Sequence, residues 1–146
     1  MILIDTNVIS EFWKAEPSPE VLTWMDAQTV ETLYLSAITL AELRFGLATM
    51  PDGKRRAIYQ KRLEKEVLPM FTGRVLAFDQ NASQAYADLM ARAKTNGKAI
   101  AQADGYIAAI AAAHNLTVAT RDTSPFEAAG VAVINPWLWK LQAKSH

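Results

Sequence analysis

Short apolar runs that alternate with longer amphipathic segments constrain the fold of this 146-residue chain more than any other feature. Each run is too short for a helix and is bounded by polar or turn residues, which is typical of a strand. The runs are Ile2 to Ile4, Leu33 to Ser36, Val75 to Phe78, Leu116 to Thr120 and Val131 to Ile134. This order of elements predicts an α/β protein, an α/β/α sandwich with a central parallel sheet of about five short strands.

Helical periodicity fills the segments between these runs. Apolar residues at Leu40, Leu43, Leu47 and Met50 have the spacing of one helix face. The other segments of helical character are Pro19 to Gln28, Arg55 to Leu68, Ala82 to Ala93 and Ile107 to His114. Because no repeat, low-complexity tract or linker interrupts the pattern, we expect residues 1–146 to form one domain.

Composition excludes several classes of function. The chain has 15 basic and 15 acidic residues, and this zero net charge excludes a protein that coats nucleic acid through bulk electrostatics. It has no cysteine, which excludes disulfides, thiolate metal sites and cysteine nucleophiles. The N-terminal apolar run stops at Asp5 without a basic region before it, and no run approaches the length of a membrane span. We therefore expect a cytoplasmic protein with no membrane partner.

Four acidic residues follow predicted strands or open the next helix: Asp5, Glu42, Asp104 and Asp122. Each has a structural explanation when taken alone. Thr39-x-x-Glu42 matches a capping box, Asp104 would favour a helix dipole, and Asp5 and Asp122 would fit a turn and a cap. Taken together, they map to the edge of a parallel sheet where ligands bind, and four independent caps have no reason to share that edge.

Four carboxylates in one cleft repel one another, by about 4 kcal/mol for a pair about 4 Å apart at an effective dielectric near 20. Such a cluster must take up protons, spread apart or bind cations. Oxygen ligands favour Mg²⁺, with Mn²⁺ as a substitute, whereas zinc is not expected because His114 and His146 lie far from the acids in sequence. Metal held by carboxylates suits phosphodiester hydrolysis, and no catalytic triad or glycine-rich phosphate loop competes for the role.

Four motifs in order make the chain recognisable: Ile2-Leu3-Ile4-Asp5-Thr6-Asn7, Ser36-Ala37-Ile38-Thr39-Leu40-Ala41-Glu42, Ala103-Asp104-Gly105-Tyr106 and Ala119-Thr120-Arg121-Asp122. They closely resemble the PIN-domain ribonucleases, specifically the VapC toxins of bacterial toxin–antitoxin pairs in their FitB-like branch. The resemblance runs from Met1 to about Pro136. It implies a magnesium-dependent endoribonuclease that cuts RNA, forms a homodimer and is neutralised by a cognate antitoxin.

The resemblance also implies roles for individual residues. Asp5 and Asp104 match direct metal ligands, Glu42 a ligand or a general base acting through water, and Asp122 a second-site or water-mediated ligand. These four are the expected catalytic residues. The neighbouring positions that orient the carboxylates through hydroxyl or amide groups are Thr6, Asn7 and Thr120.

One position departs from the family pattern. Relatives in this branch often carry asparagine where Asp122 stands and a further aspartate where Pro125 stands. Asp122 would then supply alone what the relatives divide between two positions.

RNA requires cations and aromatic side chains near the acids. The nearest cations in sequence are Arg44, Lys98 and Arg121, which we expect to meet phosphates. The segment Lys54 to Lys65 has six bases against one acid and contains Tyr59, and it is either a solvated helix face or a surface for RNA.

The tryptophans and the toxin resemblance suggest how a partner would act. At least two of Trp13, Trp24, Trp137 and Trp139 should pack in the core, while Pro136 to Trp139 would also suit a dimer or antitoxin surface. An antitoxin side chain, such as an arginine, that enters the acidic cleft would compete with the metal.

Two other functions remain open from the sequence. A phosphorelay receiver domain needs an acidic pair after its first strand, which Asp5-Thr6-Asn7 lacks, although Asp79 is compatible with its phosphoacceptor position. A catalytically idle PIN-like module that binds RNA or protein would keep the fold without the chemistry, and the presence of all four acids argues against it.

Overall fold

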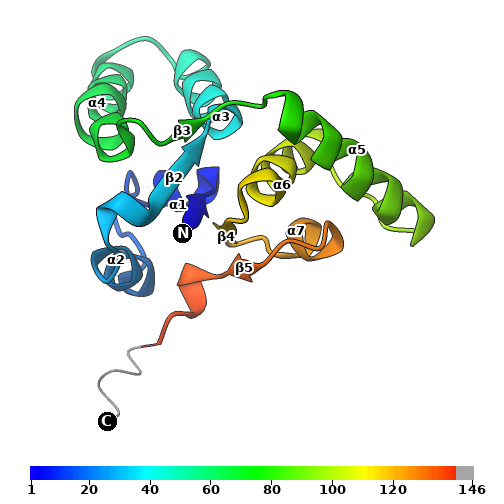
Figure 1. The fold of residues 1–146 in the computed structure, drawn as a ribbon. Coiled ribbons are helices and arrows are strands. Elements are labelled where there is room, and N and C mark those ends of the chain that lie inside the picture. The colour runs from blue at the N-terminus through cyan, green and yellow to red at the C-terminus, as the bar shows by residue number, and fades with distance from the viewer. Residues whose placement is uncertain (141–146) are drawn as a thin grey trace.

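Five parallel strands form one sheet in the computed structural model, which describes residues 1–140 (Figure 1). The strands are β1 (Ile2–Ile4), β2 (Leu33–Ser36), β3 (Val75–Leu76), β4 (Thr117–Ala119) and β5 (Val133–Ile134), in the order β3-β2-β1-β4-β5. Ile4 at the end of β1 pairs with Leu35 on one side and with Ala119 on the other. This register brings the carboxyl ends of β1, β2 and β4 side by side, as a parallel α/β sheet requires. Residues 141–146, which include His146, lie outside the described residues.

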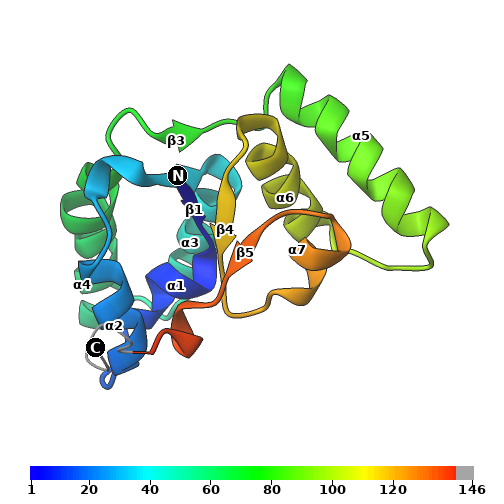
Figure 2. The ribbon, with the colours of Figure 1, turned by 60° about the horizontal axis from the view of Figure 1, so that its bottom comes forward.

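Helices cover both faces of the sheet (Figures 1 and 2). They are α1 (Thr6–Glu11), α2 (Pro19–Asp26), α3 (Ala37–Ala48), α4 (Lys54–Arg62), α5 (Gln80–Thr95), α6 (Gln102–His114) and α7 (Ser124–Ala128). Helices α1 to α4 pack on one face and α5 to α7 on the other. Alternation along the strand explains this, since Leu3 belongs to the apolar cluster under α5 to α7 and Ile4 to the cluster under α1 to α4. The predicted α/β/α sandwich is confirmed.

Short helical turns complete the connections. They are η1 (Val30–Thr32), η2 (Leu63–Val67), η3 (Leu68–Phe71) and η4 (Pro136–Leu138). The predicted helical segment from Arg55 to Leu68 is helical throughout, but it is not one α-helix, because α4 ends at Arg62 and the chain widens into the π-helical turn η2. The 3-10 turn that follows contains Pro69, which cannot donate a helical hydrogen bond.

Three strands are shorter than the sequence predicts. The edge strand β3 stops at Leu76 instead of Phe78, since Asp79 already caps α5 by accepting the Ala82 N–H at 2.9 Å. At the other edge, Val131 donates its N–H to Phe126 in the turn that ends α7, so β5 begins only at Val133. β4 spans Thr117–Ala119 and omits the predicted end residues Leu116 and Thr120.

Two of the alternative structural explanations for the acids, the capping box at Thr39 and a cap at Asp122, are not what the structure shows. Ser36, not Thr39, caps α3, because the Ser36 hydroxyl accepts the Thr39 N–H at 2.9 Å. Thr39 lies inside the helix, and within residues 1–140 its buried hydroxyl has no hydrogen-bond partner. Likewise the N-cap of α7 is Thr123, so Asp122 is not its capping residue. Helix capping therefore does not account for Glu42 or for Asp122.

The tryptophans divide as expected. Trp24 is fully buried, Trp13 and Trp137 pack partly against the same apolar cluster, and Trp139 is exposed. Within residues 1–140 no helix has the length and apolar character needed to cross a membrane.

Candidate active site

A pocket of about 390 Å³ opens where β1 ends and α1 begins. We call it the acidic pocket, and it is lined by Asp5, Thr6, Asn7, Ser10, Glu11, Lys14, Glu42, Asp104, Arg121 and Trp137. Three of the four acids singled out in the sequence line it, from the start of α1, from α3 and from α6. Segments nearly one hundred residues apart in the chain thus meet at one sheet edge, as the positions of Asp5 and Asp104 show.

Asp5 is the buried centre of this pocket, with 6% of its surface exposed. One carboxylate oxygen accepts the Thr6 N–H at 2.8 Å, and the other accepts the Thr120 hydroxyl at 2.8 Å. Burial, helped by the charges of Asp104 and Glu42, raises the pKa of Asp5 from 3.8 to about 6 in spite of these two hydrogen bonds. The site therefore holds a carboxyl group that strongly favours a cation or a proton nearby.

Thr120 links several parts of the site through one fully buried hydroxyl. Besides donating to Asp5, this hydroxyl accepts the Asp122 N–H at 3.2 Å and the Asn7 side-chain amide at 3.2 Å. The carbonyl oxygen of that Asn7 amide accepts the Arg121 N–H at 3.2 Å. These bonds fasten the loop after β4 to the start of α1.

Glu42 is oriented from the opposite side of the pocket. Its carboxylate accepts the Thr6 hydroxyl at 2.7 Å, although the two residues are 36 positions apart. Because Ser36 caps α3, Glu42 lies in the second turn of that helix and its side chain is available to the pocket. Of the residues expected to orient the carboxylates, Thr6 and Thr120 bond to a carboxylate directly, whereas Asn7 bonds to the Thr120 hydroxyl.

Asp104 lies in the first turn of α6, partly buried. Burial raises its pKa, and the nearby charges of Glu42 and Asp122 raise it as well. Its neighbour Gly105 lets α6 approach α5 closely, since a Cβ there would lie only 3.0 Å from the Met90 sulfur and 3.1 Å from the Tyr86 ring. Asp122 does not line the acidic pocket, but it is close enough for its charge to raise the pKa of Asp104.

The three cations expected near the acids occupy different places. Arg121 lines the acidic pocket, and its guanidinium lies 5.3 Å from the centre of the Trp137 ring. Arg44 instead pairs with Glu64 at 2.6 Å and lines a separate hollow beside Gln60 and Leu63. Lys98 lies in the exposed connection between α5 and α6 and does not line the acidic pocket.

Sequence reasoning missed Glu11 and Lys14 as pocket residues. Glu11 is 4% exposed, accepts the Ser18 N–H at 2.8 Å and pairs with the Lys14 ammonium at 2.9 Å. Although burial opposes it, these contacts lower the pKa of Glu11, and the Arg121 charge lowers it further. The signal was present, because Asn7, Glu11 and Lys14 recur at helical spacing after Asp5.

The donor set suits a hard cation that retains water. Within residues 1–140 no three Asp, Glu, His or Cys side chains converge tightly enough to enclose a metal ion. Magnesium does not need such a cage, since proteins commonly bind it through one or two carboxylates, water and substrate phosphate oxygens. No histidine lines the pocket, which also agrees with an oxygen-ligated metal.

Comparison with known proteins agrees with the geometry. Residues 2–131 match the PIN domain family. The VapC ribonuclease Y4jK of Sinorhizobium fredii is 72% identical over 137 residues, which cover 94% of this chain and 98% of that protein. Toxin FitB of Neisseria gonorrhoeae is 55% identical over 94% of this chain and 99% of its own.

A solved structure extends the likeness to three dimensions. The crystal structure of FitAcB from Neisseria gonorrhoeae superimposes with a TM-score of 0.92 and 54% identity, covering 94% of this chain and 99% of that chain. The chain therefore belongs to the PIN domain family, in the group that contains the VapC ribonuclease Y4jK and the toxin FitB.

Proposed function

We propose that this protein is a magnesium-dependent endoribonuclease and the toxin of a toxin–antitoxin pair. The observation that carries the proposal is the acidic pocket, where Asp5, Glu42 and Asp104 meet from three separate segments. None of the three ion pairs within residues 1–140 neutralises any of them. The names of the relatives at 72% and 55% identity, a VapC ribonuclease and a toxin, support the same function.

Asp5 and Asp104 would hold Mg²⁺, or Mn²⁺ as a substitute, with Glu42 and Asp122 completing the set directly or through water. A bound divalent ion lowers the pKa of water and neutralises charge on the phosphate and the leaving oxygen. Thr120 and Thr6 fix the orientation of Asp5 and Glu42 through bonds of 2.8 and 2.7 Å. Preorganisation of this kind avoids rearrangement during the reaction.

Arg121 and Lys14 would offset the repulsion between RNA and the acids. Both line the acidic pocket, and Arg121 is held by its stacking on Trp137. An arginine beside a carboxylate cluster suits bidentate contact with a phosphate. We assign Arg121 to the phosphate next to the bond that is cut.

A toxin must be restrained, and we propose a cognate antitoxin that reaches the acidic pocket. An arginine of the partner would form ion pairs with Asp5 and Asp104 and compete with the metal. The pocket is open to solvent at Glu42, which is exposed, so a side chain has access.

We further propose a homodimer. Exposed apolar side chains include Phe45 on α3, 71% exposed, and Leu138, 70% exposed. Sedimentation velocity of the wild type and of Phe45→Ser tests whether α3 contributes to the contact between the two copies.

The test of the nuclease is cleavage of total RNA in Mg²⁺, in chelator, and with Asp5→Asn in Mg²⁺. We expect fragments only from the wild type in Mg²⁺. Equal fragmentation in all three samples would indicate a contaminating nuclease. RNA that is bound but not cut in any sample would favour the idle binding module instead.

A further inference from the structure

A second hollow adjoins the acidic pocket on the side of α4. It has a volume of about 1030 Å³, and Ser10 and Lys14 line both spaces, so the two lie next to each other. We call it the basic groove. The side chains that characterise it are Trp13, Lys54, Arg55, Tyr59 and Arg62.

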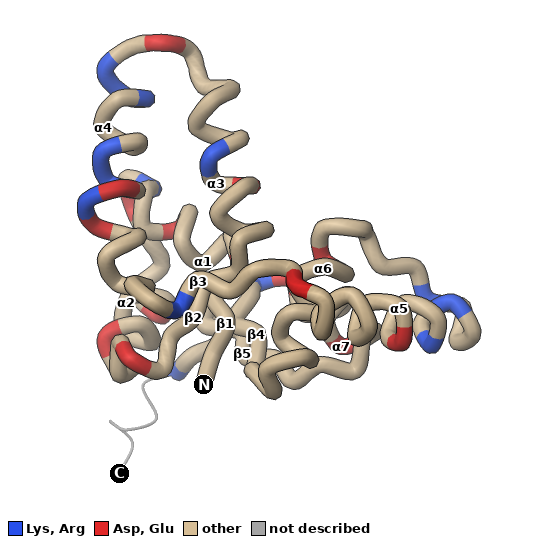
Figure 3. The backbone as a smooth tube through the Cα atoms, turned by 45° about the horizontal axis from the view of Figure 1, so that its top comes forward, with Lys and Arg blue, Asp and Glu red and all other residues tan. Residues whose placement is uncertain are grey.

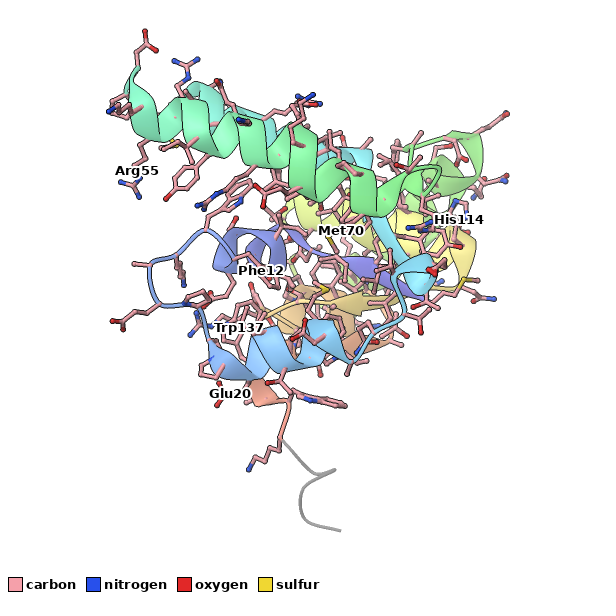
Figure 4. The ribbon with its side chains drawn as sticks, turned by 90° about the vertical axis from the view of Figure 1, so that its left-hand side faces the viewer. Phe12, Glu20, Arg55, Met70, His114 and Trp137 are labelled. Atoms are coloured by element: carbon pink, nitrogen blue, oxygen red, sulfur yellow. The ribbon has the colours of Figure 1, made fainter. Side chains whose placement is uncertain are left out.

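All the charged residues that line the basic groove are basic. Lys14, Lys54, Arg55 and Arg62 line it, and no acidic residue does. Figure 3 shows the Lys and Arg positions recurring along α4, which projects beside α3. In Figure 4, Arg55 extends from the N-terminal end of α4 toward the side where the loop after α1 lies. A polyanion that enters the acidic pocket would find further basic side chains here, next to the pocket.

Two aromatic rings form the floor of the basic groove. Trp13 and Tyr59 stack with their centres 5.7 Å apart and their planes 19° apart, and the Tyr59 hydroxyl donates to the Trp13 carbonyl at 3.2 Å. The guanidinium groups of Arg55 and Arg62 lie 5.5 and 5.6 Å from the centre of the Tyr59 ring. Arginines on an aromatic platform are the arrangement that binds stacked bases and backbone phosphates together.

We propose that the basic groove binds the single-stranded RNA that flanks the phosphodiester in the acidic pocket. This inference rests on the proposed nuclease function and assigns its substrate path. The exposed cations on α4 would contact phosphates, and the Trp13 and Tyr59 platform would stack against bases. Double-stranded RNA fits less well, because its bases are already stacked and present no free faces to aromatic side chains.

The charge test uses two variants that each lose two exposed cations. The double variant Lys54→Ala with Arg55→Ala removes them from the basic groove, whereas Arg92→Ala with Lys94→Ala removes them from α5. Fluorescence anisotropy with a labelled single-stranded RNA, in chelator to prevent cleavage, measures affinity at several salt concentrations. We expect the groove variant to bind at least about tenfold more weakly, with a salt slope reduced by about 1.4. The α5 variant should match the wild type.

The aromatic test compares two substitutions at one position. Tyr59→Phe keeps the ring and should bind RNA as the wild type does. Tyr59→Leu removes the ring and should weaken binding by about tenfold. Thermal unfolding followed by circular dichroism separates this effect from a loss of folding, since Tyr59 is partly buried.

The outcomes distinguish this inference from the proposed function. If the wild type neither cuts nor binds RNA, both fail. If the wild type cuts RNA but the groove and α5 variants bind it equally, the groove assignment alone is overturned. If the groove variant keeps its RNA affinity and loses affinity for poly-glutamate, the groove is a protein-binding surface and the proposal is overturned as well.

Discussion

The acidic pocket and the basic groove share Ser10 and Lys14 but are built in opposite ways. In the acidic pocket, hydrogen bonds between distant segments fix the charged atoms, as in the bond from Thr120 to Asp5 across 115 positions. In the basic groove, Lys54 and Arg55 are exposed residues of a single helix. Chemistry requires groups held in place, whereas binding a flexible strand tolerates side chains that adapt.

This difference has a measurable consequence. A substitution in the acidic pocket should change the reaction rate, the pH dependence and the stability together, because the same bonds serve all three. A substitution in the basic groove should change RNA affinity with little effect on stability, because exposed side chains contribute little to folding.

The largest expected effect is on the reaction. Asp104→Asn removes one charge that would hold the metal, and we expect RNA cleavage to fall by more than about 100-fold, since metal stabilisation contributes several kcal/mol to the transition state. The measurement is the initial rate of cleavage of a labelled RNA in Mg²⁺. Retention of a tenth of the wild-type rate would remove Asp104 from the catalytic set.

The next effect concerns stability and pH. A buried carboxyl with a pKa raised from 3.8 to about 6 is most favourable to folding when protonated, so this contribution is lost as the pH rises from about 4 through about 6. The loss amounts to about 3 kcal/mol. We therefore expect metal-free wild type to lose most of this stability, about 2.4 kcal/mol, relative to Asp5→Asn between pH 4 and pH 7.

Urea unfolding in chelator at both pH values measures the free energy of unfolding of the two proteins. Comparing each protein with itself at the two pH values removes the part of the cost of the substitution that does not depend on pH. An equal pH dependence in both proteins would show that the charged form of Asp5 does not destabilise the folded protein.

Thr120→Val should have a smaller effect on stability, about 1–3 kcal/mol, because it leaves polar groups around a buried hydroxyl unpaired. It should also raise the pKa of Asp5 further, because the hydroxyl bond to the charged carboxylate is lost. Urea unfolding and carboxyl NMR titration measure the two effects. Thr117→Val is the matched control, since within residues 1–140 the Thr117 hydroxyl makes no hydrogen bond to another residue. Equal losses in both variants would contradict the role of Thr120.

The smallest effect is expected at Arg44, a cation outside both regions. Its pair with Glu64 is about half exposed on each side, at 51% and 48%. A double-mutant cycle of Arg44→Ala and Glu64→Ala should give a coupling of about 0–1 kcal/mol. RNA affinity should fall less for Arg44→Ala than for Lys54→Ala with Arg55→Ala. A larger fall in RNA affinity for Arg44→Ala would show that Arg44 contacts RNA, and it would weaken the contrast between the two regions.

Much of the acidic pocket could be predicted from sequence because its residues sit at fixed places in a parallel sheet. Asp5 directly follows β1, Glu42 lies in the helix after β2 and Asp104 lies in the first turn of α6, so the alternation of strands and helices was enough to group these acids. The orienting roles of Thr6 and Thr120 were expected from the family resemblance, and the structure adds the partner of each, Glu42 for Thr6 and Asp5 for Thr120.

The sequence failed where the outcome depends on side-chain direction and packing. Arg44 is only two residues after Glu42, yet this spacing points it to another side of α3, where Glu64 meets it. Trp13 and Tyr59 are 46 positions apart, and no local pattern reveals that their rings stack. The capping box suggested by Thr39 and Glu42 does not form, because Ser36, three residues earlier, caps the same helix.

The central claim is that the acidic pocket holds a catalytic divalent cation. Titration of Mn²⁺ into the protein, followed by electron paramagnetic resonance, measures this directly for the wild type and for Asp104→Asn. We predict that the wild type binds Mn²⁺ at pH 7 and that Asp104→Asn binds it at least about tenfold more weakly. Equal Mn²⁺ affinity in the two proteins would contradict the account. So would a wild type that binds no Mn²⁺ either with RNA or without it.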